Sequence, residues 1–462
     1  MLYAATLTRG VSWDDSAELA AGVARLGVVH STGYPPYVLL GHAFALVDPF
    51  SSRATSANLF SAVTAALAVG LAARYVLVVS GSVACAVLAA LLLALGPLFW
   101  FQATVASVYP LLAFAAALLL NAGHAWWERP SAGRLALVAF AIGLVALAHT
   151  GGLTFALGGA VFVASRGRRA VRGWRDALAL LAVVIPFLTL VYIPLRSGYS
   201  GFPNRGGISV FDMVFGGTGT FSGDTPLTAN RYGFFAHARS LVVLLLASLS
   251  PAALVLVPLG LRRLVRDRAY LLCCLGPAVA ASAVVVTMRS GYAYWHLPLL
   301  LAGAIACGVG LPAALAWVRG RALAAAALAL ALLVVPVCGV AFLATAHRDA
   351  SGWARSTLQA LPPRARVVAP WIAYAPLRAE QTIDGVRRDV RVELTSTGVP
   401  VDVRTLHGDF AVAVSRTAPV VPGGLRVGPE SGANFKGLSG LRAGPFEIGF
   451  ESTAVRTYRL PE

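Results

Sequence analysis

The chain has 462 residues, of which 58% are hydrophobic and only 12% are charged, and its mean hydropathy is +0.74. A soluble protein carries about twice that share of charged residues, so this composition excludes an ordinary soluble protein and indicates a polytopic membrane protein. The net charge of +17 comes almost wholly from arginine, since Lys436 is the only lysine. No ladder of basic and aromatic residues accompanies the arginines, so nucleic acid is not an expected partner.

Residues 1–10 are apolar but too short to cross a bilayer, which takes about 20 residues. They are typical of the end of a membrane span, so we expect a late start codon or a truncated chain. Short amphipathic helices are predicted over 16–27 and 36–47, both at the membrane interface.

The polar stretch from Ser12 to Tyr37 lies between these segments. It holds three acids (Asp14, Asp15 and Glu18), although only nine of the chain's twenty acids precede residue 347. Carboxylates at the edge of a membrane domain are costly unless they are solvated, paired or used. We therefore take this stretch as the chemical centre of the protein.

Ten apolar spans follow, which makes the predicted fold class mainly α: a polytopic α-helical membrane protein. The spans lie near residues 54–73, 77–98, 108–126, 134–148, 151–165, 177–195, 239–260, 269–288, 296–317 and 322–345. Arginine-bearing loops fall on one side of these spans, and the positive-inside rule makes that side the cytoplasm. The external side then receives residues 11–50, 99–107, 149–150, 196–238 and 289–295, and everything after residue 346.

The composition changes at His347, after which eleven acids appear. A helix is expected over 351–361, followed by strands such as Arg366–Ala369, Asp389–Glu393 and Phe410–Ser415. The predicted organisation is a transmembrane domain (1–346), with external loops at 11–50 and 196–238, and a small external α/β domain (347–462). The five cysteines lie in apolar segments without metal-ligand spacing, so we expect small packing residues and no disulfides.

Several motifs resemble a known family in order along the chain. They are W-D-D-S-A-E-L from Trp13, L-G-V-V-H-S-T-G-Y-P-P-Y from Leu26, R-A-T-S-A-N from Arg53, Phe99-Trp100 to Val108-Tyr109, Gly143-Leu144 to His149, and Tyr192 to Arg196. The family includes an animal O-mannosyltransferase and is related to the protein O-mannosyltransferases. Its members have the GT-C fold of membrane glycosyltransferases that use polyprenyl-phosphate sugars. The chain departs from the family pattern at Ser31-Thr32, at Ala17, and at Ser107, where a glutamate is usual.

The resemblance implies that Asp15 is the catalytic base, which deprotonates an acceptor hydroxyl as it attacks the sugar, with Glu18 in support and Asp14 in reserve. The alternative is a capping box, because Asp-x-x-Glu before an apolar helix also satisfies the first amides of that helix.

Other residues are expected to bind substrate. His149 lies at the tip between two short spans, on the predicted external side, where a hairpin-tip histidine is the alternative. His30 is a substrate contact or a helix C-cap, and Tyr34 and Tyr109 line the pocket or pack. His42 is interpreted as structural.

A polyprenyl-phosphate donor calls for a cation at the outer interface, and arginine binds phosphate through two parallel hydrogen bonds. Arg196 is the first choice because it ends a family-like segment, ahead of Arg205, Arg231 and Arg289; the alternative for each is a snorkelling anchor. Trp126, Trp127 and Trp295 are interpreted as belt aromatics at span ends.

The leading hypothesis is a glycosyltransferase of the bacterial inner membrane. It would move a mannose-like hexose from a polyprenyl-phosphate donor to a hydroxyl of a protein, lipid or glycan on the outer side. The sequence implies no cofactor and leaves a divalent metal open. One alternative is a transporter or flippase of polyprenyl-linked glycans, which usually places ionisable residues at mid-membrane. The other is a non-catalytic envelope assembly protein, an alternative that the missing glutamate at Ser107 leaves open.

Overall fold

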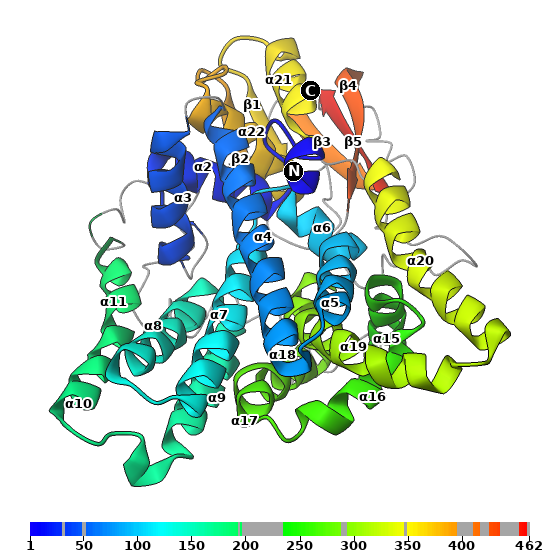
Figure 1. The fold of residues 1–462 in the computed structure, drawn as a ribbon. Coiled ribbons are helices and arrows are strands. Elements are labelled where there is room, and N and C mark those ends of the chain that lie inside the picture. The colour runs from blue at the N-terminus through cyan, green and yellow to red at the C-terminus, as the bar shows by residue number, and fades with distance from the viewer. Residues whose placement is uncertain are drawn as a thin grey trace.

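The computed structural model describes residues 1–29, 33–48, 52–192, 195, 234–287, 293–345, 349–394, 410–415, 425–434 and 452–459. These residues form a helical body with a β-sheet at one end, and the chain's N-terminus lies at the same end as the sheet (Figure 1). The predicted side chains His30, Arg196, Arg205, Arg231 and Arg289 lie outside the described residues.

The helical body begins with the short helix α1 and two helices of the first loop, followed by longer apolar helices. The bounds are α1 (Leu2–Ala5), α2 (Asp15–Arg25), α3 (Pro35–Val47), α4 (Arg53–Ser80), α5 (Val83–Leu95), α6 (Pro97–Ala103), α7 (Tyr109–Glu128), α8 (Ala132–Ala148), α9 (Gly152–Ala164), α10 (Trp174–Leu180), α11 (Val184–Phe187), α15 (Phe234–Leu249), α16 (Ala253–Leu264), α17 (Arg268–Tyr270), α18 (Gly276–Thr287), α19 (Leu297–Val318) and α20 (Ala322–Thr345). Short 3₁₀ and π turns lie between some of them, at Gly167–Arg169, Leu181–Val183, Leu188–Val191, Leu271–Leu275 and Ala293–His296.

Six helices of the described chain are long and apolar enough to cross a membrane, or up to eight if each bent pair counts as one span. The predicted spans 108–126, 296–317 and 322–345 correspond closely to α7, α19 and α20. The predicted spans 134–148 and 151–165 correspond to α8 and α9, which are apolar but shorter. The composition-based prediction of a multi-pass membrane protein is therefore confirmed.

Two predicted spans are broken rather than straight. Helices α5 and α6 meet at an angle of 68° at Gly96-Pro97. The part of α15 from Leu241 to Leu249 meets α16 at 85°. Pro97 begins α6 because proline has no N–H to continue α5, and Ser250, before Pro251, has a positive φ of 77°. The sequence prediction treated residues 77–98 and 239–260 as continuous spans, because apolar composition alone does not show where a helix bends.

Close packing of α16 on α19 depends on glycine. A Cβ on Gly260 would lie 1.9 Å from the carbonyl oxygen of Ala306, and one on Gly310 would lie 2.1 Å from that of Leu256. Only hydrogen fits at these two positions. Small residues at such crossings are typical of membrane helices, whose association depends on close backbone approach.

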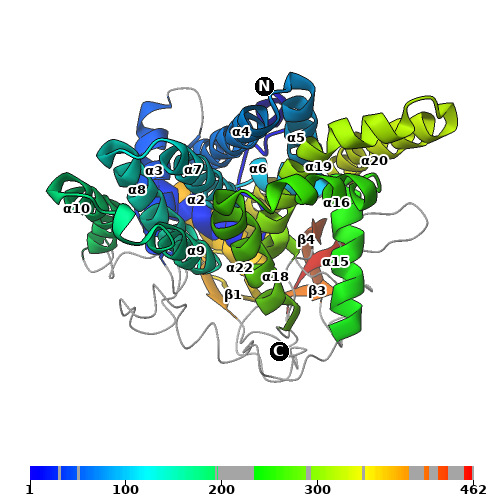
Figure 2. The same cartoon turned by 60° about the horizontal axis from the view of Figure 1, so that its bottom comes forward.

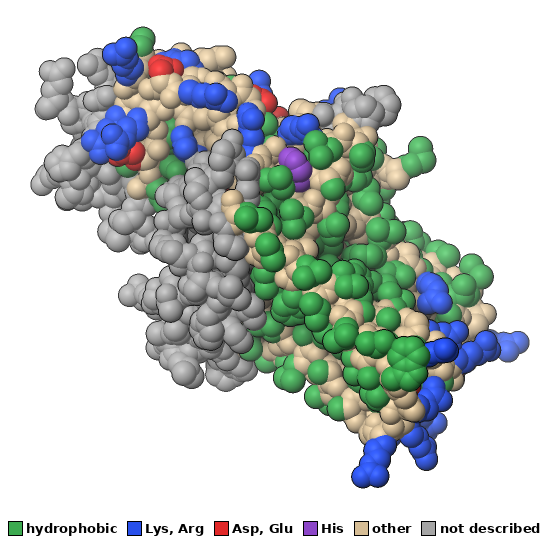
Figure 3. Space-filling view, turned by 90° about the vertical axis from the view of Figure 1, so that its left-hand side faces the viewer, with side chains coloured by type: hydrophobic (Ala, Val, Ile, Leu, Met, Phe, Trp, Pro, Cys, Tyr) green, Lys and Arg blue, Asp and Glu red, His purple; other side chains and the backbone are tan. Residues whose placement is uncertain are grey.

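Basic side chains gather at the end of the helical body far from the sheet, beyond a surface rich in hydrophobic side chains (Figure 3). There Arg166 lies over the rings of Trp126 and Trp127, at 4.9 and 4.8 Å, and donates to both of their carbonyl oxygens. Asp267 joins three helices at this end, because its carboxylate accepts from Tyr75 at 2.8 Å and lies 2.8 Å from His124 Nδ1. Trp126, interpreted from the sequence as a belt aromatic, is only 1% exposed, because it packs inside the helical body.

The C-terminal part contains a five-stranded sheet and two helices, α21 (Ser351–Ala360) and α22 (Trp371–Ile383). Its strands are β1 (Arg366–Ala369), β2 (Arg391–Leu394), β3 (Phe410–Ser415), β4 (Leu425–Asn434) and β5 (Ser452–Arg459). The strand order is β2-β1-β3-β5-β4, in which β1 is parallel to β2 and β3, and β5 is antiparallel to β3 and β4. The helix expected over 351–361 and the strands expected at 366–369 and 410–415 are confirmed. The boundary at residue 346 stays a prediction.

Candidate functional site

The three acids of the first loop lie at the start of α2, at the end of the body nearest the sheet (Figure 1). Asp14 is the residue before the helix, and its backbone has φ 63° and ψ −142°. Asp14 is only 9% exposed. A residue with a side chain held in this region costs about 1–3 kcal/mol, and such outliers cluster at functional sites. The strain therefore marks this turn as a position where geometry matters.

Asp15 is the first residue of α2, and its carboxylate faces the C-terminal part of the chain. The indole N–H of Trp371, the first residue of α22, donates a hydrogen bond of 2.8 Å to Asp15 Oδ1. In a capping box the aspartate would precede the helix and accept from its first-turn amides. Here Asp14 holds the N-cap position and makes no side-chain cap hydrogen bond. The described helix start does not have the capping-box arrangement.

Glu18 lies one turn along α2 and is 3% exposed. It faces α22, where Tyr374 is also buried. Burial raises the pKa of the Tyr374 hydroxyl. Arg378 lowers this pKa, and Glu18 raises it further. Asp15 and Glu18, which lie one turn apart, thus both lie on the side of α2 on which α22 packs.

His149 is the centre of a second group of predicted residues. Tyr34 stacks on its ring with centroids 5.9 Å apart and an interplanar angle of 8°, and Tyr109 Oη lies 3.3 Å from its Nε2. The amide of Gly151 donates to His149 Nδ1 at 3.0 Å. The structure thus brings together three predicted residues from three separate stretches of chain.

Two aromatic residues that the sequence did not single out as site residues complete this group. Trp295 lies edge-on to His149 with centroids 5.7 Å apart, and Tyr294 packs on Tyr109 at 4.7 Å. Trp295 was interpreted as a belt aromatic, and nothing in its local sequence indicates the contact with His149. Trp371 was missed for the same reason: its partner Asp15 is 356 residues away.

Ser107, at the place of the family's glutamate, is buried in a hydroxyl network. Its Oγ donates to Gln102 Oε1 at 2.6 Å, and its backbone N–H donates to Tyr37 Oη and Ser61 Oγ, both at 3.0 Å. The position is therefore filled by neutral groups that satisfy one another. The network ties α3 and α4 to the turn before α7 and to Tyr109, whose amide donates to Ser107 Oγ.

Two other predictions concern histidine and metal. The ring of His42 contacts the carbonyl oxygen of Val23 through Nδ1 at 2.7 Å, which confirms a structural role in joining α3 to α2. Among the described residues, no three His, Cys, Asp or Glu side chains are grouped to hold a metal ion.

Comparisons with known proteins agree with the motif-based resemblance. Residues 15–170 match the family described as the N-terminal domain of the protein O-mannosyl-transferase TMEM260. The mouse protein O-mannosyl-transferase TMEM260 is 34% identical over 110 residues. These residues are 24% of this chain and 16% of the mouse protein, so the match spans only a small part of that relative.

Solved structures extend the comparison to the whole chain. ArnT from Cupriavidus metallidurans bound to undecaprenyl phosphate has a TM-score of 0.55 and 16% identity, over 98% of this chain and 96% of ArnT. The apo form of the same protein has a TM-score of 0.53 and 15% identity, over 98% of this chain and 95% of ArnT. The chain has the GT-C fold. The predicted fold class, a polytopic α-helical GT-C membrane protein, is confirmed, as is the resemblance to the O-mannosyltransferases over residues 15–170.

Within this GT-C fold, the family-matched segment holds Asp15, Glu18, Tyr34, Tyr109 and His149. The tryptophan that contacts Asp15 and the aromatic pair beside His149 lie outside that segment. The arrangement offers a half-buried carboxylate that can accept a proton and, separately, a histidine framed by aromatic rings.

Proposed function

We propose that this protein transfers a hexose from a polyprenyl-phosphate donor to a hydroxyl group of an acceptor on the outer side of the bacterial inner membrane. The observation that carries the proposal is the position of Asp15. It lies in the segment that matches the O-mannosyl-transferase family, beside a buried second carboxylate and a strained turn. Helix α2, which begins at Asp15, lies at the end of the fold nearest the sheet (Figure 1). The name of the mouse relative supports a mannose-like sugar, and the acceptor is a protein, lipid or glycan.

In this mechanism Asp15 takes the proton of the acceptor hydroxyl while that oxygen attacks the anomeric carbon. The bond from that carbon to the donor phosphate oxygen breaks, and the polyprenyl phosphate leaves with the electron pair. Glu18, one turn further along α2, has the supporting role in this proposal. Inversion at the anomeric carbon is the expectation from the family.

The donor's phosphate requires cationic partners, for which we propose Arg196, with Arg205, Arg231 and Arg289 as alternatives. The crystal structure of ArnT, which shares the fold, is bound to undecaprenyl phosphate, and this supports a polyprenyl-phosphate donor here. His149, Tyr34, Tyr109 and His30 are proposed to bind the sugar or the acceptor.

The experiment that tests this function measures sugar transfer by the purified protein. Undecaprenyl phosphate carrying radiolabelled mannose, glucose or galactose is offered with protein and glycan acceptors extracted from bacterial envelopes. Asp15→Asn should fold and bind donor but lose roughly 100- to 10,000-fold in rate, because an amide cannot accept the proton. Glu18→Gln should lose less, since its role is supporting.

Asp14→Asn is the matched control, because it makes the same change one residue away. If Asp14→Asn is inactive while Asp15→Asn transfers normally, Asp14 is the base. If both variants transfer at the wild-type rate, the base is another residue of this protein. If the wild-type protein transfers none of the labelled sugars, the transporter and assembly hypotheses gain support.

A further inference from the structure

Helix α22 of the C-terminal part lies against α2 of the first loop (Figure 2). The contacts at their two ends show that they run in the same direction. Their first residues meet through the Trp371–Asp15 hydrogen bond. At the other end, Arg25 donates to the carbonyl oxygens of Thr382 and Ile383, at 2.9 and 3.1 Å. Carbonyls in the last turn of a helix have no partner within it, so Arg25 caps α22. The contact between the helices is therefore fixed at both ends.

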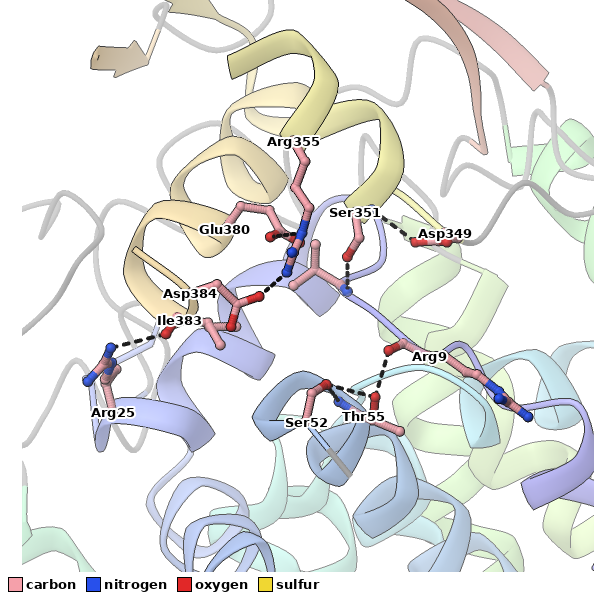
Figure 4. A network of polar contacts seen from close by, with 11 residues as sticks. Arg9, Arg25, Ser52, Thr55, Asp349, Ser351, Arg355, Glu380, Ile383 and Asp384 are labelled. Atoms are coloured by element: carbon pink, nitrogen blue, oxygen red, sulfur yellow. Dashed lines mark hydrogen bonds and ion pairs between the residues drawn. The ribbon is translucent and has the colours of Figure 1, made fainter. Parts of the chain in front are cut away.

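Figure 4 shows how α22 is also held from its other side. Arg355 of α21 pairs with Glu380 at 2.7 Å and with Asp384. Helix α21 is in turn attached to the N-terminal segment, because the Val11 amide donates to Ser351 Oγ at 2.8 Å. Since α22 is tied to α21 as well as to α2, its first residue has a defined position relative to the acids of the first loop.

Trp371 presents its N–H from a rigid support. Its ring stacks on Tyr374, one turn further along α22, with centroids 5.9 Å apart and an interplanar angle of 25°. A base must hold its carboxylate within hydrogen-bond reach of the proton that it takes, and neighbours with locked rotamers supply that order. Asp15 itself is the first residue of its helix and is half-buried, and the Trp371 indole is a neighbour of this kind.

We propose that Trp371 is a positioning residue for Asp15, so that the C-terminal part of the chain completes the candidate active site. The proposal rests on the proposed function, in which Asp15 is the base. Trp371 holds one carboxylate oxygen and thereby orients the other towards the acceptor hydroxyl. It contributes nothing to proton transfer itself.

The test compares two tryptophans of the C-terminal part. Trp371→Phe keeps an aromatic ring but removes the N–H. Trp353→Phe makes the same change at a buried ring that packs on Trp13 at 5.1 Å and whose Nε1 has no hydrogen-bond acceptor among the described residues. The assay uses undecaprenyl-phosphate mannose, or whichever labelled donor sugar the wild-type protein transfers.

Trp371→Phe should lower kcat roughly 10- to 100-fold at an unchanged KM for the donor, which is the scale of a misplaced catalytic group. Trp353→Phe should keep the wild-type kcat. Trp371→His, which restores a ring N–H, should recover part of the loss. In an Asp15→Asn background, Trp371→Phe should cause no further loss, because it acts only through the carboxylate.

Wild-type kcat in Trp371→Phe, equal losses in the two phenylalanine variants, or an additive loss in the double variant would each overturn the proposal. Two outcomes separate it from the function on which it rests. Wild-type transfer by Asp15→Asn removes the base assignment and the positioning role together. An inactive Asp15→Asn with a fully active Trp371→Phe removes the positioning role alone.

Discussion

At the scale of single residues, one hydrogen bond defines the tautomer of the neutral His149 ring. Because the Gly151 amide donates to Nδ1, that nitrogen holds a lone pair, and the proton of the neutral ring is on Nε2. His149 then donates to Tyr109 Oη, 3.3 Å away, which leaves the hydroxyl hydrogen of Tyr109 available for a different acceptor. The order from backbone to imidazole to phenol can present a hydrogen-bond donor to a sugar hydroxyl.

A pair of substitutions separates this role from that of a hairpin-tip histidine. His149→Phe leaves the Gly151 N–H without its acceptor and should destabilise the protein by about 1–3 kcal/mol. His149→Asn can accept from Gly151 through its short amide but does not reach Tyr109. It should therefore melt like the wild type yet transfer sugar up to about tenfold more slowly, which corresponds to one neutral hydrogen bond. Wild-type transfer by His149→Asn would leave His149 with the structural role alone.

The candidate site shows which residues a sequence can predict and which it cannot. Asp15 was predicted because its motif is contiguous, and Tyr34, Tyr109 and His149 because each lies in a family-like segment. Their mutual contacts depend on how α3, α7 and α8 pack, which no local pattern encodes. His30 and Arg196 lie outside the described residues and stay predictions.

At the scale of elements, the contact between α21 and α22 includes a carboxyl group with an altered proton affinity. Burial raises the pKa of Glu380 above its ordinary 4.5, by more than Ser351 and Arg355 lower it. The folded state therefore binds this proton more tightly than the unfolded state does. The stability that this group contributes is fully present below the unfolded pKa and is lost as the pH rises through the folded pKa.

Glu380→Gln tests this coupling, because glutamine stays neutral at every pH. Melting temperatures in detergent should show the wild type losing stability relative to Glu380→Gln as the pH rises from about 4.5 upwards. Asp389→Asn is a control of opposite sign, since the Arg387 hydrogen bond lowers the pKa of Asp389. Its contribution is present above the ordinary 3.8 and should stay constant over the same range. A pH-independent difference for Glu380→Gln would contradict the assignment.

The boundaries of helix α4 show where a prediction from local sequence succeeds and where it fails. Helix α4 begins after Ser52, whose hydroxyl accepts from the Thr55 amide, and continues to Ser80 because nothing in it interrupts the helix. The sequence prediction ended that span at residue 73 because of Arg74. In the structure this side chain donates to Asn121 on α7 at 2.7 Å, so the arginine is accommodated within the helix and does not end it.

At the scale of the whole molecule, charge and fold agree on two opposite ends. The acids of the first loop, α22 and the sheet lie at one end, and the arginine-bearing turns after α9 and α16 lie at the other (Figure 1). Composition was enough to predict a multi-pass helical fold, because the length of an apolar segment and the position of an arginine can both be read directly from the sequence. The parallel packing of α22 on α2 joins residues that are far apart in the sequence, so no local pattern predicts it. This packing brings the C-terminal part to the candidate site.

This polarity yields a test of orientation in the membrane. If the arginine-rich end is cytoplasmic, alkaline phosphatase fused after Glu462 should be active in a bacterial host, because that enzyme matures only outside the cytoplasm. A fluorescent protein that folds only in the cytoplasm should be dark at the same position. Fusions within the exposed arginine segment, after Arg169, should give the reverse pattern and serve as the internal control. The opposite result at both positions would place Asp15 and Trp371 in the cytoplasm, where the site could not serve an external acceptor.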